Sequence, residues 1–324
     1  MPSASIRAGV IGALVVLLAG CGAKNGTVPT VSSAQAKAHQ RSGSSGDLVY
    51  AVTAKGIVIL TYPDWSIVAR ISGFRNWYSI CSDPNSGNVF AVTGTNEIDE
   101  FAHGGTTPIA TLILPAGYPN ACAVDPTTGN LAVVAGGTPT ELSDSVFIYP
   151  QAQGTPAVYS DKRLPGLVSP VYDGSGNLFI GAQDRFRAFR IAELKAGHND
   201  LLEIKVEGAH NVYPHQLQWD GTYLVFLDTN GPGYGTTVNQ VTVNGRIGTI
   251  VRTFLLTHCQ DDQFSIFNGS LLSFYYPPKQ RDHYAVAAWP YPAGGKPSSR
   301  HYGITQGRED YTYDLTVSVK PSNR

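Results

Sequence analysis

The hydrophobic pattern from residue 46 onward is one short motif repeated at regular spacing. A Gly, mostly followed by Asn, precedes a run of apolar or alternating residues, as in "GNVFAV" and "GNLAVV". Six copies begin at residues 46, 87, 129, 176, 221 and 269, so successive copies lie 41 to 48 residues apart. Short apolar runs bounded by turn residues are typical of β-strands. Between copies lie two further short strand-like segments, and about four strands per 45 residues predicts a propeller blade.

A second strand pattern precedes five of the six copies and ends in Asp or Asn. These segments lie at residues 77–83, 120–125, 169–173, 215–220 and 263–268. The first copy lacks such a partner, whereas a strand-like segment near the C-terminus is left over. Because a closed ring leaves no uncovered sheet edge, we expect residues 312–318 to pair with residues 48–53. The predicted fold is therefore all-β, a six-bladed β-propeller of four-stranded blades over residues 47–319, followed by a tail at 320–324.

The segments "DPNSGN" and "DPTTGN" predict the hairpins that join the first two strands of a blade. Pro presets φ, Asp accepts backbone N–H groups, and Gly and Asn tolerate positive φ. An alternative is a calcium site formed by Asp83, Asp125 and Asp173. Each blade offers one such carboxylate, whereas calcium needs several converging oxygens, so a structural role is favoured.

Residues 1–20, which end immediately before Cys21, form an export signal. Arg7 precedes the apolar stretch 10–18, and the apolar run of about a dozen residues is shorter than the roughly 20 that a membrane-spanning helix needs. The sequence "LAGC" that ends at Cys21 resembles the bacterial lipobox. That resemblance implies cleavage after residue 20 and acylation of Cys21, with palmitate-type chains as the membrane anchor. Residues 21–46 then form a polar tether, and the protein is expected in the bacterial cell envelope, extracytoplasmic, on the periplasmic or outer surface.

The repeat resembles the NHL and YVTN class of propellers, whose blades carry an inner strand, a D-x-x-G-N turn and a "lYV" second strand. The resemblance covers residues 47–319 and implies a fold rather than an activity. Together with the lipobox and the tether, the motifs "GDLVYAV" and "CAVDPTTGNLAV" are also similar to a group of uncharacterised bacterial lipoproteins. That similarity implies a location.

Charge excludes one class of partner. The chain has 23 basic and 24 acidic residues, a formal net charge of −1. A protein that binds nucleic acid needs a positive surface to hold phosphates, so DNA and RNA are not expected as partners.

Candidate functional residues are expected on the loops that enter the innermost strands, at the mouth of the axial channel. These loops differ between blades and supply the polar and aromatic residues Trp77, Asn120, His215, Asp261, Asp262, Glu309, Asp310 and Tyr311.

The sequence favours a binding or interaction module without a cofactor. It leaves open whether the protein is also an enzyme. Its ligand is expected to be a protein, a glycan or another cell-envelope component. The alternative is a metal-dependent hydrolase that resembles the gluconolactonases, in which a divalent cation such as calcium is held at the channel mouth. Asp261 and Asp262 are adjacent in a strand and point in opposite directions, so at most one of them faces the channel.

Three cysteines remain beside Cys21, and an exported protein can form disulfides. Cys81 and Cys122 occupy the innermost strands of neighbouring blades with opposite parity. If the blades follow one another in one direction around the ring, the two side chains face each other across the blade interface and can form a disulfide. If the blades follow in the other direction, the side chains point apart and both remain buried thiols. Cys259 is the third.

Overall fold

The computed structural model describes residues 46–72, 77–136, 144–184, 186, 188–209, 216–228, 235–276, 284–306 and 310–321, without the side chains of residues 77, 78 and 260–262. The predicted signal peptide, Cys21 and the tether up to residue 45 lie outside the described residues.

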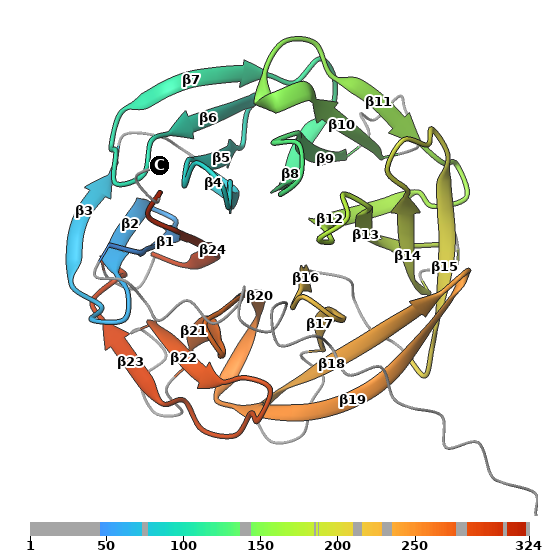
Figure 1. Ribbon diagram of the computed structural model, residues 1–324. Helices are drawn as coiled ribbons and strands as arrows, with labels where there is room; N and C mark the ends of the chain where they lie inside the picture. Colours follow the sequence, from blue (N-terminus) through green and yellow to red (C-terminus); the bar gives the residue numbers. More distant parts are fainter. Residues whose placement is uncertain are drawn as a thin grey trace, which may run out of the picture.

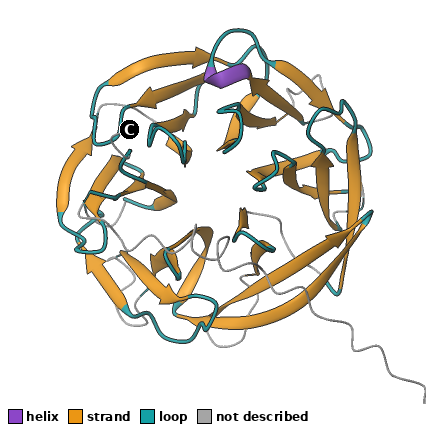
Figure 2. Ribbon diagram, viewed as in Figure 1, coloured by secondary structure: helices purple, strands orange, loops and turns teal. Residues whose placement is uncertain are grey.

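The described chain is almost entirely β structure and forms a ring of small sheets around a central axis (Figure 1; Figure 2). The sheet with both ends of the ring has the order β24-β1-β2-β3, formed by Thr312–Ser318, Leu48–Thr53, Gly56–Thr61 and Ile67–Ile71. The next sheet has the order β4-β5-β6-β7, formed by Trp77–Ser82, Val89–Thr93, Glu97–Phe101 and Pro108–Ile113.

Two further sheets also have four strands. One has the order β11-β10-β9-β8, formed by Ala157–Ser160, Ser145–Tyr149, Leu131–Gly136 and Tyr118–Val124, and a short 3₁₀-helix, Pro150–Ala152, follows β10. The other has the order β20-β21-β22-β23, formed by Cys259–Phe267, Ser270–Tyr275, Ala285–Pro290 and Ser299–Tyr302. The chain is thus all-β and arranged as a propeller, as the sequence predicts.

The remaining strands form one eight-stranded sheet, which differs from the expected separate four-stranded blades. Its order is β12-β13-β14-β15-β19-β18-β17-β16, formed by Gly166–Tyr172, Leu178–Gln183, Phe189–Leu194, Leu201–Glu207, Ile247–Thr257, Gly235–Asn244, Leu224–Asp228 and Leu217–Trp219.

The two halves of this sheet meet because β18 and β19 are long, at 10 and 11 residues. The far end of β19 reaches β15 and pairs with it in parallel, with Lys205 opposite Ile247. Gly248 makes the close approach possible, since a Cβ there would lie 3.3 Å from a methyl group of Val206.

The ends of the propeller pair as the sequence predicts. Strand β24 runs antiparallel to β1, with Leu48 opposite Ser318 and Ala51 opposite Leu315. Beside this pair, the ring nitrogens of His103 lie 2.7 Å from Ser318 Oγ and 2.8 Å from Gly46 O. The closing pair is therefore also attached to the following sheet.

The hydrophobic core lies between neighbouring sheets, which explains why the second strands are apolar on both faces. In β1, Leu48 and Tyr50 pack toward the β4–β7 sheet, whereas Val49 and Ala51 pack toward the β20–β23 sheet. The described residues form six such clusters around the ring, and one of them lies between the two halves of the eight-stranded sheet. Apolar burial between sheets is thus the main stabilising contribution.

The Asp-Pro turns have the predicted geometry. The carboxylate of Asp83 accepts the N–H of Asn85 at 2.8 Å and the hydroxyl of Ser86 at 2.6 Å, and Gly87 has φ 73°. The carboxylate of Asp125 makes equivalent contacts in the next sheet. The carboxylates of Asp83 and Asp125 thus stabilise the hairpin turns through hydrogen bonds within each turn.

Candidate ligand-binding cavity

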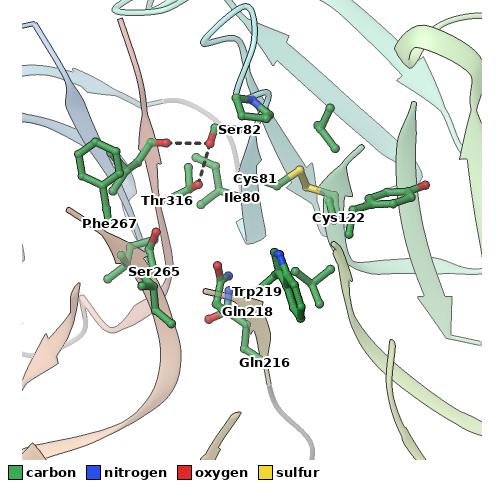
Figure 3. A pocket seen from close by; sticks show the side chains of 18 of the residues that line it. Ile80, Cys81, Ser82, Cys122, Gln216, Gln218, Trp219, Ser265, Phe267 and Thr316 are labelled. Carbon is green, nitrogen blue, oxygen red and sulfur yellow. Dashed lines mark hydrogen bonds between the residues drawn. A yellow bond between two sulfur atoms is a disulfide. The ribbon is translucent and has the colours of Figure 1, made fainter. Parts of the chain in front are cut away.

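An axial cavity of about 820 Å³ lies between the strands nearest the axis, which are β4, β8, β12, β16, β20 and β24 (Figure 1; Figure 3). This volume lies within the range of about 300–1,000 Å³ that is typical of small-molecule sites. The lining extends from the middle of these strands to the turns that follow them, at Pro84, Pro126 and Asn268. The cavity thus extends toward the face that carries the Asp-Pro turns.

The wall of this cavity is nearly free of charge. Serine, threonine, asparagine and glutamine side chains alternate with apolar residues and with the rings of Tyr172, Trp219, Phe267 and Tyr291. Among the described residues that line it, none is Lys, Arg, His or Glu, and Asp220 is the one carboxylate. An ionic ligand would therefore find little opposite charge.

The Asp220 carboxylate is fully engaged by the protein. Oδ1 accepts the backbone N–H groups of Thr222 and Tyr223 at 2.8 and 2.7 Å. Oδ2 accepts the amide of Gln240 at 2.8 Å and the hydroxyl of Tyr291 at 2.5 Å. Asp220 thus fastens a turn to the neighbouring sheet instead of offering a free charge to the cavity.

Two phenols in the wall stay neutral. Burial raises the pKa of Tyr291, and the hydrogen bond to Asp220 raises it further. Burial likewise raises the pKa of Tyr172. Neither residue has the lowered pKa expected of a phenol that acts as a base near neutral pH.

Five of the six inner strands contain a bulge near their N-terminal end. The register shifts between Trp77 and Ser79 in β4, between Pro119 and Ala121 in β8, and at corresponding places in β12, β20 and β24. In β8 the extra residue is Asn120, which is exposed and lines the cavity. Bulges re-aim side chains and interrupt the regular ladder.

Backbone groups near the bulges are bound by side chains from the preceding inner strand. Asp314, 1% exposed, accepts the N–H of Ile80 at 3.0 Å and the hydroxyl of Ser79 at 2.7 Å. The N–H of Leu217 donates to Ser169 Oγ at 3.1 Å. These bonds link neighbouring sheets next to the axis and fix the shape of the wall.

Gln216 extends the same arrangement. Its Oε1 accepts the N–H of Phe264 in β20, and its Nε2 donates to Asp314 Oδ1 across 3.4 Å. Both ends of this amide are therefore occupied by protein groups.

A disulfide forms part of the wall. Cys81 in β4 and Cys122 in β8, the pair identified as a candidate from the sequence, are bonded, with their Cα atoms 5.7 Å apart (Figure 3). The bond joins two neighbouring sheets next to the axis. Cys259 is a buried, unbridged cysteine.

The structure separates the predicted site residues. Asn120 lines the cavity, and Tyr311 is 52% exposed. Asp310 is 0% exposed, and its two oxygens accept the backbone N–H groups of Lys55 at 3.1 Å and Gln306 at 2.6 Å. Asp310 therefore holds a turn together and offers no oxygen to the channel mouth, because its carboxylate satisfies buried backbone donors.

The other five predicted residues lie wholly or partly outside the description. Trp77 belongs to β4, and Asp261 and Asp262 belong to β20, but their side chains lie outside the described part of the molecule; His215 and Glu309 lie entirely outside it. Of the eight residues predicted at the channel mouth, Asn120 is thus the one that the described structure places in the cavity wall.

The sequence analysis missed Gln218 and Trp219 as cavity residues. Both belong to β16 and line the cavity, and Figure 3 shows Trp219 below the disulfide in that view. The available signal was their position in a segment predicted to be an inner strand. Which side chains of that strand line the cavity depends on how β16 is turned relative to the axis, and the pattern does not show this.

Within the described part of the chain, no group of three or more His, Cys, Asp or Glu residues is placed to hold a metal ion. The metal-dependent hydrolase thus stays a prediction that concerns residues outside the description. The described residues also include no helix long and apolar enough to cross a membrane.

Comparisons with known proteins show the fold. No protein-family model matches the sequence, and no curated protein does. A chain in the crystal structure of a nidogen/laminin complex is similar, with a TM-score of 0.62 and 14% identity, covering 86% of this chain and all of that one. A Bacteroides caccae protein of unknown function has a TM-score of 0.61 and 13% identity over 85% of this chain and 99% of its own.

The β-propeller domain of Myceliophteria thermophila Cps50 (Swd1) has a TM-score of 0.51 and 12% identity, over 82% of this chain and 86% of that domain. At such low identity these similarities establish the propeller fold alone.

Proposed function

We propose that this protein is a lipid-anchored, extracytoplasmic binding module that holds its ligand in the axial cavity. The observation that carries the proposal is the cavity itself, about 820 Å³ in volume and walled by neutral polar and aromatic side chains from all the inner strands. Sites for small ligands combine apolar and aromatic walls with a few well-placed polar groups. The bonds of Asp314, Ser169 and Gln216 keep such a wall preorganised.

The propeller is proposed to have six blades of the NHL and YVTN class, with the eight-stranded sheet counted as two. Six core clusters support this count, since each one lies between two neighbouring four-stranded units. The parallel contact between β15 and β19 spans three residue pairs, which fits a contact between two blades better than one continuous blade.

Two observations support the proposed location. The "LAGC" sequence before and at Cys21 matches a lipobox. The disulfide between Cys81 and Cys122 fits an oxidising compartment outside the cytoplasm. A Cys21→Ser variant is expected to move from the membrane fraction to the soluble fraction, whereas the matched Cys259→Ser variant stays in the membrane fraction; equal distribution of both would contradict the anchor.

The binding role is tested by blocking the cavity. Asn120→Trp places a large ring in the cavity at an exposed position, and Asn244→Trp places the same ring at the exposed end of β18. The full-length protein in detergent is screened by thermal denaturation against small-molecule, oligosaccharide and peptide libraries. A ligand at about 100 times its Kd stabilises the native state by about 2.7 kcal/mol.

We expect this stabilisation in the wild type and in Asn244→Trp, and its loss in Asn120→Trp. A ligand that stabilises all three proteins equally would place binding elsewhere and refute the axial site.

A further inference from the structure

We propose that the ligand of the axial cavity is an uncharged, hydroxyl-rich molecule, a neutral saccharide, held by Asn120, Gln218 and Trp219. This inference rests on the proposed binding function and deepens it by naming the class of ligand.

The charge of the wall carries the first step. Asp220 is the one carboxylate among the described lining residues, and each of its oxygens already accepts two hydrogen bonds. A carboxylate or phosphate ligand would meet no cation in the described wall. Transferring an unpaired charge into such a site carries a large desolvation cost. The wall therefore favours a neutral ligand.

The uncommitted polar groups carry the second step. The neighbouring amide Gln216 is occupied at both ends, whereas the described residues offer no hydrogen bond to the side chains of Asn120, Gln218 or Trp219. Each amide presents an acceptor oxygen and a donor NH₂ group, and the indole presents a donor. Sugar hydroxyls both donate and accept, so they match these groups. A purely apolar ligand would leave both amides without partners.

The aromatic surface adds a platform. Trp219 is partly buried against the apolar cluster formed by strands β13 to β18, which restrains its ring, while the same residue lines the cavity (Figure 3). A fixed aromatic ring offers a large apolar face together with a polar N–H. The apolar face of one sugar ring can lie on such a surface, and Asn120 and Gln218, which line other parts of the same cavity, can bind hydroxyls elsewhere on the saccharide.

The bulges in the inner strands favour a saccharide over an extended peptide as the ligand. An extended peptide binds a sheet edge through a continuous row of unpaired backbone groups. The bulges in the ladders of β4, β8, β12, β20 and β24 break the regular alternation of backbone groups along these strands. The sixth inner strand, β16, has three residues. None of the inner strands therefore presents a long regular edge for strand addition, and side-chain recognition is favoured.

The test compares three sets of probes with the full-length protein in detergent. The sets are neutral trisaccharides (cellotriose, maltotriose and N-acetylchitotriose), acidic trigalacturonate, and a library of short peptides, with binding followed by calorimetry and tryptophan fluorescence. We expect a neutral trisaccharide to bind and trigalacturonate to bind more weakly or not at all. Losing one neutral hydrogen bond should weaken binding about 3- to 10-fold in Gln218→Ala and in Asn120→Ala.

Gln183→Ala is the matched control, because Gln183 lies in β13 away from the cavity, and it should bind like the wild type. Neutral trisaccharide binding that is unchanged in Gln218→Ala and Asn120→Ala would overturn the inference. Binding of peptides or trigalacturonate alone, weakened by Gln218→Ala, would overturn the saccharide and leave the binding module standing. No binding by any set would overturn both.

Discussion

Removing the disulfide between Cys81 and Cys122 is expected to lower the free energy of unfolding by about 4 kcal/mol. The bond closes a loop with a sequence separation of 41 residues. In the chain-entropy description, closing a loop of this length removes about 13 cal/mol/K from the unfolded ensemble, or about 4 kcal/mol at 25 °C. Both half-cystines are buried in the apolar cluster between these sheets, so any packing lost on substitution would add to this entropic contribution.

The assay is thermal unfolding of the full-length Cys81→Ser/Cys122→Ser variant with and without reducing agent. For a protein of this size 1 kcal/mol corresponds to about 2–3 °C, so the midpoint should fall by about 8–12 °C. Reduced wild-type protein should unfold close to the variant. Cys259→Ala is the control, since it removes a thiol and keeps the bridge, and it should remain sensitive to the reducing agent.

One result would refute the reasoning. If the double variant and the reduced wild type unfold at the same midpoint as the oxidised wild type, the bridge adds nothing to the constraint already imposed by ring closure. The stability of the β4–β8 interface would then come from apolar packing alone.

Three further predictions concern buried groups and metal. Asp314→Ala should lower the free energy of unfolding in urea by about 3 kcal/mol, because it leaves the Ser79 hydroxyl and the Ile80 N–H without their acceptor, and Asp314→Asn should lower it by less. A negligible loss in both variants would contradict this. Burial raises the pKa of Tyr149 from 10.0 to about 12, so its stabilising contribution is complete below pH 10 and is lost as pH rises through 12; a urea midpoint unchanged over that interval would disprove it. Metal analysis should find no stoichiometric divalent ion, and an ion lost in Asp261→Ala would instead support a hydrolase.

Much of the architecture could be predicted because it follows from repetition. The strand left over at the C-terminus had a single uncovered edge to join, and its pairing with β1 spans the predicted residues. The Asp-Pro turns were also predictable, because Asp83 and Gly87 have roles set by local backbone geometry.

Other features depend on tertiary packing that no local pattern encodes. The joined sheet arises from the length of β18 and β19 and from space at Gly248, which become apparent once neighbouring strands are in place. Asp310 was expected at the channel mouth, but the N–H groups of Lys55 and Gln306 use its carboxylate. The role of Gln218 was missed because it depends on how the short strand β16 is turned relative to the axis.

The long strand β19 gives the ring an uneven stiffness. At one end Lys205 donates its N–H to Arg246 O at 3.0 Å, and at the other the N–H of Thr257 donates to Gly295 O at 2.8 Å. Backbone hydrogen bonds thus connect three consecutive units of the ring into one arc. On the opposite side the disulfide joins β4 to β8. Breathing motions should therefore concentrate at interfaces that neither the β19 bonds nor the disulfide spans, such as the one between β8 and β12.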